Sequence, residues 1–283
     1  MKTQVKLTAW ITGLAVAGAL NAGAGVPLNS LDGSGGIAFN PLAYPAGQNA
    51  DPTDTSTVSK VLSKPQFGVW YVNLGDPHIN WGTVGVAETV FKRLELSYGR
   101  EIVAINGAGS NTWTKNTLGS KLLLVEENQG GYNFIPALAI GAKWKNTDAN
   151  NPGLSGWSNS GVDGYVVASK LITQLPRPVL ISGGLLETKE LVTGVLGFDD
   201  EYKLTYFGNV DVLPFDFLAV GVEYKNGAQY NDFKNANYWD AHVAWFVNKN
   251  LTLVAAYVNT GDADSTSKVG FGGGVVLSAQ YAF

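Results

Sequence analysis

The stretch Tyr202–Lys225, YKLTYFGNVDVLPFDFLAVGVEYK, decides the fold, because both of its halves alternate apolar and polar residues around a short turn. Leu204 and Tyr206 alternate with polar neighbours before the turn, and Val220 and Val222 do so after it. Successive side chains of a strand point to opposite faces, so a period of two indicates a strand with one apolar face. The stretch therefore predicts two long strands joined by a tight connection.

The same alternation recurs along most of the chain, for example in RLELSYGRE (93–101) and YWDAHVAWF (238–246). The pattern predicts strands near 65–74, 80–89, 92–102, 116–126, 132–145, 161–174, 177–188, 202–212, 215–225, 237–247, 249–259 and 272–283. Short turns then alternate with longer polar loops, and both ends of the strand region fall on the short-turn side. This layout is typical of outer-membrane barrels, although a soluble β-sandwich would show the same alternation.

Composition separates those two classes. The chain has 35 Gly, 8 Trp, 12 Tyr and 12 Phe, and charged residues make up only 15 %. A soluble domain has roughly 25 % charged residues. The net charge of -4 argues against a nucleic-acid partner, and the lack of Cys excludes disulfides and thiolate metal sites. We expect an all-β, transmembrane, antiparallel up-and-down barrel of about twelve strands, preceded by an irregular N-terminal segment.

The N-terminus divides into two predicted parts before the barrel at 65–283. Lys2 and Lys6 precede an uncharged run at 7–20 and then small residues, which predicts a cleaved signal peptide over 1–24. The Gly- and Pro-rich segment 25–64 has two interpretations, a plug folded into the lumen or a disordered periplasmic leader. Gly35 and Gly36 would suit a close backbone approach inside a narrow lumen.

The strand at the C-terminal end finishes on an aromatic pair, Tyr281 and Phe283. An exposed apolar edge strand promotes aggregation, whereas a closed barrel pairs its last strand with its first and leaves no free edge. The terminal pattern also resembles the signal that the barrel assembly machinery recognises in Gram-negative outer-membrane barrels. That resemblance implies an assembly role for Tyr281 and Phe283.

A wider resemblance covers roughly residues 28–283. The segments GTVGVAETVFKRLELSYGRE (82–101) and LGFDDEYKLTYFGNVDVLPFDFLAVGVEYKN (196–226) are similar to an uncharacterised bacterial family, the domain of unknown function 3034. The Gly-rich opening LDGSGGIAFNPLAYPAG (31–47) is similar as well. The resemblance implies an outer-membrane-like barrel and brings no catalytic or ligand residues with it.

The polar faces of the predicted strands define the lumen. The residues expected to line it are Arg93, Glu95, Lys121, Lys143, Lys145, Lys170, Glu187, Lys203, Asp211, Glu223, Lys225, Asp240 and His242. A water-filled lumen with this mixed lining would conduct small solutes and tune charge selectivity. In a narrow lumen the same charges would pair and close it, because an isolated buried charge is costly. Both alternatives stay open at this point.

Chemistry beyond passage has little support in the sequence. Asp240 and His242 are two apart on one strand, so they share a face and would suit a general base or two metal ligands. A third partner is not visible, His78 falls in a turn, and the carboxylates of GVDG and GFDD lack the spacing of a calcium loop. We therefore expect no catalytic, cofactor or metal site.

These observations predict a cell outer-membrane barrel that passes small solutes. Its expected partners are outer-membrane lipid and lipopolysaccharide, the barrel assembly machinery and a small solute. The alternatives are a closed structural or interaction barrel that presents its outer loops and, least favoured, a lipid-active barrel enzyme.

Overall fold

The computed structural model describes residues 27–47, 61–75, 78–106, 111–149, 157–231, 233–262 and 268–283. The predicted signal peptide lies outside these residues. Two short strands open the described chain, β1 (Leu28–Asn29) and β2 (Gly35–Gly36), and pair only with each other. The described residues also contain two 3-10 turns, η1 (Gln129–Gly131) and η3 (Val192–Gly194).

The remaining strands form the barrel wall. They are β3 (Gln66–Leu74), β4 (Ile79–Val90), β5 (Leu94–Ile105), β6 (Asn111–Val125), β7 (Ala137–Thr147), β8 (Ser160–Ile172), β9 (Val179–Leu191), β10 (Gly197–Phe215), β11 (Leu218–Lys225), β12 (Tyr238–Phe246), β13 (Leu251–Asn259) and β14 (Gly273–Ala282). Each pairs antiparallel with its neighbours in the chain, and β14 pairs with β3. The predicted closed barrel of twelve strands is confirmed.

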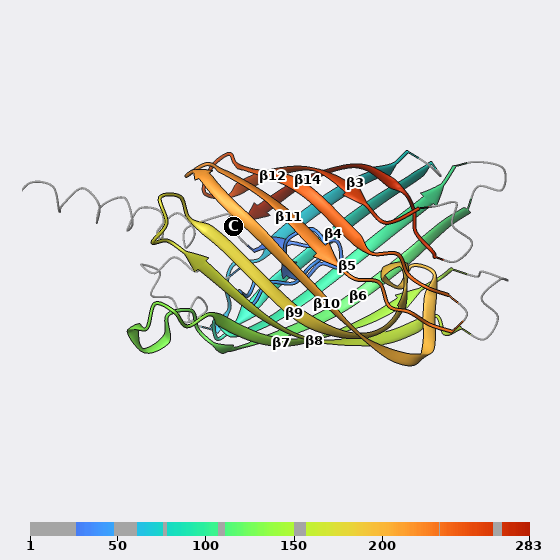
Figure 1. The fold of residues 1–283 in the computed structure, drawn as a ribbon, viewed down its shortest axis with the longest axis horizontal. Coiled ribbons are helices and arrows are strands. Elements are labelled where there is room, and N and C mark those ends of the chain that lie inside the picture. The colour runs from blue at the N-terminus through green and yellow to red at the C-terminus, as the bar shows by residue number, and fades with distance from the viewer. Residues whose placement is uncertain are drawn as a thin grey trace, which may run out of the picture.

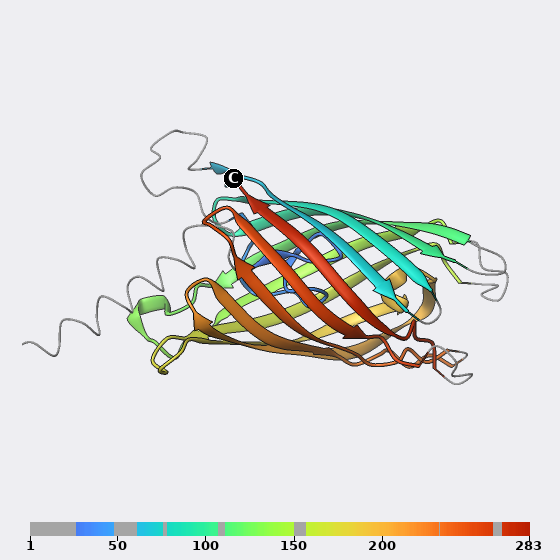
Figure 2. The same ribbon diagram turned by 90° about the horizontal axis from the view of Figure 1, so that it is seen from above.

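Closure explains why the chain tolerates a strand at its C-terminal end. Tyr281 of β14 lies opposite Phe67 of β3, and the backbone N–H of Phe283 donates to the Pro65 carbonyl. The edge groups of β14 are thus satisfied by β3 instead of facing solvent. Figures 1 and 2 show the tilted strands running the length of the barrel, with β14 beside β3.

The outside of the barrel is strongly apolar. Along β5, exposed side chains such as Leu96 and Ile102 alternate with buried ones. Leu204 is 68 % exposed and Val222 is 53 % exposed, and many other large apolar side chains of the wall are exposed as well. A surface that faces water rarely carries so many exposed large apolar side chains. A continuous apolar band of this kind suits contact with lipid. Within the described residues, no helix is long and apolar enough to cross a membrane.

Two predicted strand boundaries are wrong in an informative way. The connection between β6 and β7 spans 126–136, although Tyr132 and Phe134 alternate like a strand there. It folds as turns, with left-handed Asn128 and Gly130 and with Ile135 donating its N–H back to the Tyr132 carbonyl. The connection between β9 and β10 is shorter than predicted, 192–196, because Gly197 still pairs with Leu191.

Candidate functional site

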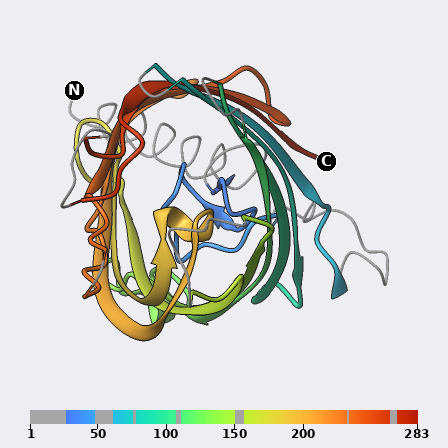
Figure 3. The ribbon, with the colours of Figure 1, turned by 90° about the vertical axis from the view of Figure 1, so that its right-hand side faces the viewer.

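The N-terminal segment, residues 27–47, lies inside the barrel. Figures 1 and 3 show it in blue within the ring of strands. Almost all of its residues are buried, including Leu42 and Asn40 with no exposed surface. Here β1 and β2 form a small hairpin in which Asn29 lies opposite Gly35. The segment therefore fills lumen space that would otherwise be open to water.

Two lumenal carboxylates hold the backbone of this segment. Glu95 accepts hydrogen bonds from the N–H groups of Gly35 at 2.7 Å and Ala46 at 2.6 Å. Glu223 accepts from the N–H groups of Ala38 at 2.5 Å and Asn40 at 2.9 Å. These contacts satisfy buried backbone donors that have no strand partner.

Neutral side chains of the wall add further contacts. Gln280 accepts from the Asn29 N–H at 2.9 Å, and the Trp70 indole donates to the Asn29 carbonyl at 2.6 Å. Gly33 adopts φ +83°, and a Cβ at this position would lie 2.5 Å from the Tyr98 carbonyl oxygen. Only glycine satisfies both the backbone conformation and this close approach.

A lysine cluster on β6 and β7 binds the one acid of the N-terminal segment, Asp32. Its carboxylate lies 2.8 Å from the Lys143 Nζ, 3.1 Å from the Lys115 Nζ and 3.3 Å from the Lys145 Nζ. Burial alone would raise the pKa of the Asp32 carboxyl, but the ammonium groups of Lys143, Lys145 and Lys115 outweigh it and hold the pKa well below its usual value. Asp32 therefore anchors the segment as a carboxylate.

The connection 192–196, which contains η3, reaches the same lysine cluster from the opposite end of the barrel. The Thr193 carbonyl accepts a hydrogen bond from the Lys115 Nζ at 2.7 Å. Figure 3, which looks along the barrel, shows this connection in gold over the lumen. Val192 and Thr193 both have left-handed φ angles, 48° and 56°, which cost energy in β-branched residues. Lys115 thus contacts both Asp32 and this inward connection.

An aromatic cap covers the inward connection. The Trp157 ring packs edge-on against Tyr230 at 5.5 Å and Phe233 at 5.6 Å between ring centroids. Asn235, from the same 226–237 connection as Tyr230, donates through Nδ2 to the Glu190 carbonyl at 2.9 Å and accepts from the Val192 N–H at 2.9 Å. These contacts hold the connection 192–196 in place over part of the lumen at this end.

The lumen wall is amphipathic. One side, built from β3, β4, β13 and β14, carries apolar side chains that pack with Leu28 and Ala38 of the N-terminal segment. A cavity between the segment and this wall, lined in part by Leu31, Phe39 and Trp81, measures about 40 Å³. That is room for about three water molecules. The opposite side carries most of the lumenal charge.

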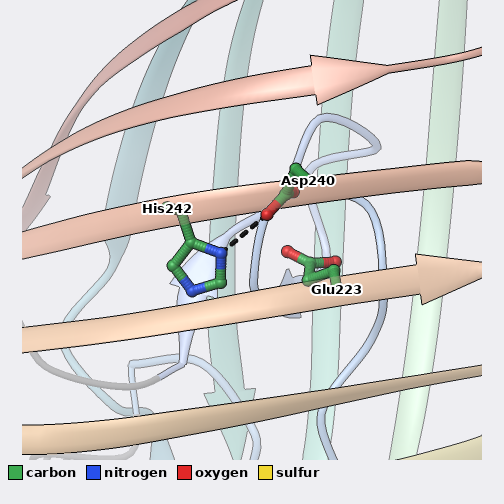
Figure 4. A group of neighbouring side chains, drawn as sticks. All are labelled: Glu223, Asp240 and His242. Carbon is green, nitrogen blue, oxygen red and sulfur yellow. Dashed lines mark hydrogen bonds and ion pairs between the residues drawn. The ribbon is translucent and has the colours of Figure 1, made fainter.

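A second polar cluster lies on β10, β11 and β12. The His242 ring contacts Asp240 through Nδ1 and Asp211 through Nε2, each at 2.7 Å. Figure 4 shows Asp240 and His242 projecting from β12 toward Glu223 on β11. Gly221, which lies between Asp211 and His242 in the sheet, permits their contact because a Cβ there would meet the His242 Nε2 at 2.7 Å. All four side chains of this Asp-His cluster are buried.

Most of the predicted lumen-lining residues do face the lumen. Those buried on the inner face are Glu95, Lys121, Lys143, Lys145, Asp211, Glu223, Lys225, Asp240 and His242. Lys203 is half-buried opposite Thr188, on the same inner face, and forms an ion pair with Glu201 at the rim.

Three of the predicted lumen positions are wrong. Arg93 lies in the turn before β5 and pairs with Glu126 at 2.9 Å. Lys170 has the outward parity of β8 and pairs with Glu127 of the 126–136 connection at 3.3 Å. Glu187 is exposed on the outer face of β9, because the inward positions there are occupied by its neighbours in the chain. Arg93 and Lys170 sit near strand ends, where the face that a residue occupies no longer decides its contacts, whereas Glu187 lies inside β9.

Sequence reasoning missed four lumenal charges of the wall, Glu101, Lys115, Asp163 and Glu190. Glu101 shares the parity of Glu95, so this signal was present in the sequence. Lys115 and Glu190 lie just beyond the predicted strand ends. Asp163 falls within the predicted strand 161–174, and it lies on the inner face of β8, 2.8 Å from the Lys145 Nζ.

The proposed assembly residues and His78 lie away from the lumen. Tyr281 is exposed on the outer face, and its ring packs 4.9 Å from that of Phe283, which also contacts Phe67 at 5.7 Å. His78 is exposed before β4 with φ 64°.

Comparisons with known proteins agree on the fold. A family model described as "Protein of unknown function (DUF3034)" matches residues 24–279. No curated protein matches the chain. Among solved structures, the KdgM porin is similar with a TM-score of 0.54 at 9 % identity, covering 77 % of this chain and 99 % of the porin. The COG4313 outer membrane channel from Pseudomonas putida F1 gives a TM-score of 0.47 at 13 % identity, covering 82 % and 99 %. At these identities the likeness concerns the fold alone.

Proposed function

Since the chain belongs to the DUF3034 family of proteins of unknown function, its role must come from its own residues, and we propose that it is a plugged outer-membrane channel for small solutes. In this proposal the N-terminal segment, residues 27–47, is the plug. Passage requires the segment to move out of the lumen or to rearrange within it.

The way the segment is held is the observation that carries the proposal. The barrel wall binds it through side chains such as Glu95 and Glu223, and no wall strand pairs with β1 or β2 in the described residues. Breaking these contacts leaves every strand pair of the wall intact. The barrel can therefore stay folded when the segment leaves, which a continuous shared sheet would not allow.

The outer membrane is the proposed location because the exterior is apolar around the whole barrel. Exposed Val84, Leu118 and Leu204 come from three different strands and would be in contact with lipid. The predicted signal peptide supports export. The exposed pair Tyr281 and Phe283 supports recognition by the barrel assembly machinery, and lipopolysaccharide is the expected neighbour of the outward loops.

The amphipathic lumen favours a solute with an apolar part and a polar or charged part. Trp70, Val72 and Val276 would face such a solute on one side once the N-terminal segment moved. Lys121 and Lys143 would face it on the other. The mixed signs of the lining support weak charge selectivity.

The test locks the N-terminal segment to the wall. A Cβ at Gly119 of β6 would lie 3.9 Å from the Ser34 Cβ, which suits a disulfide, and the chain has no native Cys. The variant Ser34→Cys/Gly119→Cys also carries Ser97→Ala, because a Cβ at Gly119 would contact the Ser97 hydroxyl. The Ser97→Ala single variant is the matched control.

Single-channel conductance in planar bilayers is the readout, with heat-modifiable gel mobility confirming a folded barrel. We expect openings in the mature protein and in the reduced lock variant, and none after oxidation. A variant lacking residues 25–64 should conduct steadily. The channel proposal is refuted if no conductance is measured for the folded mature protein, for the reduced lock variant or for the truncated barrel.

A closed interaction barrel is the second candidate. The specific observation in its favour is that a second segment enters the lumen: the connection 192–196 reaches Lys115, and the cap of Trp157, Tyr230 and Phe233 packs beside it. Such a barrel would present its outer loops to a partner and would give no conductance in any variant.

A further inference from the structure

We propose that the Asp-His cluster of β11 and β12 is a binding site for a divalent transition-metal cation, with Glu223, Asp240 and His242 as ligands. One ligand atom from each of these side chains lies within 4.8 Å of the others. The sequence pairs Asp240 with His242, and the third ligand, Glu223, comes from the neighbouring strand.

The strand register places two acidic side chains face to face. Glu223 lies directly opposite Asp240 on the lumenal side. Like charges directly opposite across an antiparallel pair are destabilising, and burial strengthens their repulsion. A cation between the two carboxylates removes this cost.

Other opposed charges in the lumen are complementary. On β5 and β6, Glu95 lies opposite Lys121 and Glu101 lies opposite Lys115. On β7 and β8, Lys143 lies opposite Asp163. Glu223 and Asp240 depart from this pattern, so their juxtaposition needs a separate physical reason.

No lysine neutralises the acidic side chains of this cluster in the described residues. Among the described residues, no lysine or arginine forms an ion pair with Asp211, Glu223 or Asp240. The nearby Lys225 pairs instead with Glu190. A single imidazolium on His242 faces three carboxyl groups, so neutralising them takes a further proton or a metal cation, because buried negative charge is expensive.

One buried acceptor of the cluster has no hydrogen-bond partner. Asp240 is 1 % exposed, and its Oδ2 has no hydrogen-bond partner, while its Oδ1 contacts the His242 Nδ1. Figure 4 shows the Asp240 carboxylate beside the His242 ring, with the Glu223 carboxyl group on the neighbouring strand. A buried carboxylate oxygen without a donor is a natural ligand for a cation.

Glu223 can serve the metal and the N-terminal segment together. Its oxygens accept the N–H groups of Ala38, Phe39 and Asn40. A carboxylate has about four lone-pair sites, so acceptance of these donors leaves capacity for a metal bond. Such outer hydrogen bonds orient metal-binding carboxylates in known sites.

The donor set selects the class of metal. One imidazole nitrogen with two carboxylates suits Zn²⁺ or a similar first-row ion better than Mg²⁺ or Ca²⁺, which prefer oxygen ligands throughout. Metal–ligand bonds of about 2.1 Å require the three side chains to move slightly closer together than they lie here. Asp211 then remains as the hydrogen-bond partner of the other imidazole nitrogen.

The experiment titrates Zn²⁺ into the chelator-treated, tag-free mature protein by isothermal titration calorimetry. The chain contains two histidines, so His78→Ala is the control for adventitious imidazole binding. We expect one Zn²⁺ site in the wild type and in His78→Ala. Both His242→Ala and the isosteric Asp240→Asn should weaken Zn²⁺ binding at least tenfold.

Two further readouts keep the result interpretable. Heat-modifiable mobility reports folding, and Asp240→Asn keeps the side-chain volume if His242→Ala fails to fold. Visible absorption of bound Co²⁺ should appear in the wild type and disappear in Asp240→Asn. The proposal is overturned if the folded wild type binds neither ion, if both cluster variants bind like the wild type, or if Ca²⁺ binds in preference to Zn²⁺.

Discussion

Replacing Asp32 by Asn should unseat the N-terminal segment while leaving the barrel folded. The Asp32 carboxylate lies within ion-pair distance of Lys115, Lys143 and Lys145. Lys115 retains Glu101 as a partner, whereas among the described residues Asp32 is the acid that pairs with Lys143. The substitution therefore leaves one buried ammonium group without its ion-pair partner.

The size of the effect follows from that single lost pair. Removing one partner of a buried ion pair costs about 3–5 kcal/mol. The Asn amide still offers a hydrogen-bond acceptor to the lysines, so we expect the lower end, about 3 kcal/mol. That corresponds to a change of about 150-fold in the docking equilibrium of the N-terminal segment. The strand pairs of the wall do not involve Asp32, so the change falls on docking.

The assay is open probability in planar bilayers, measured on barrels whose folding is confirmed by heat-modifiable mobility. Asp216→Asn, the same substitution at an exposed turn residue between β10 and β11, is the matched control and should behave like the wild type. A folded Asp32→Asn protein whose open probability equals that of the control would refute the reasoning.

Acidification tests the same anchor. Although burial opposes ionisation, the three ammonium groups hold the pKa of Asp32 well below its ordinary value. A lowered folded-state pKa contributes stability that is complete above the unfolded pKa, about 3.9, and is lost as the pH falls through the folded value. This contribution to the docking of the N-terminal segment should therefore persist from neutral pH to about pH 4 and weaken in stronger acid. We expect the open probability of the wild type to rise in that acid range, and the open probability of Asp32→Asn not to respond in this way.

Two other substitutions test the close packing of the N-terminal segment against the wall and the role of the C-terminal aromatic residue in assembly. Gly33→Ala adds strain at φ +83° and a contact with the Tyr98 carbonyl, so it should raise open probability at a cost of about 1–3 kcal/mol. Gly131→Ala, with φ +82° and open space around it, measures the strain alone, and an equal effect of both on conductance would contradict the close approach. Phe283→Ala removes two aromatic ring contacts and the proposed assembly signal, so it should lower the amount of folded barrel in the outer membrane. Phe134→Ala, at an exposed connection, should not, and unchanged levels in both would remove Phe283 from assembly.

Much of the barrel was predictable because its main signal is local. Each strand alternates apolar and polar residues with a period of two, so Leu204 and Val222 could be assigned to the outer face from their own strands alone. The same parity placed Glu95, Glu223 and His242 on the inner face. It failed at Arg93 and Lys170, near strand ends, where exposure to water no longer depends on which face a residue occupies.

What the sequence by itself determined is the closed barrel of alternating strands, with an apolar outside and a charged inside, because that pattern depends only on residues two apart. The tertiary structure alone decided which lumenal groups meet. Asp32 reaches the lysines of β6 and β7, and Glu223 meets Asp240, through strand register and the path of the N-terminal segment. A register shift of one residue would turn every side chain of a strand to the other face. Contacts of this kind join residues far apart in the chain, and no local periodicity encodes them.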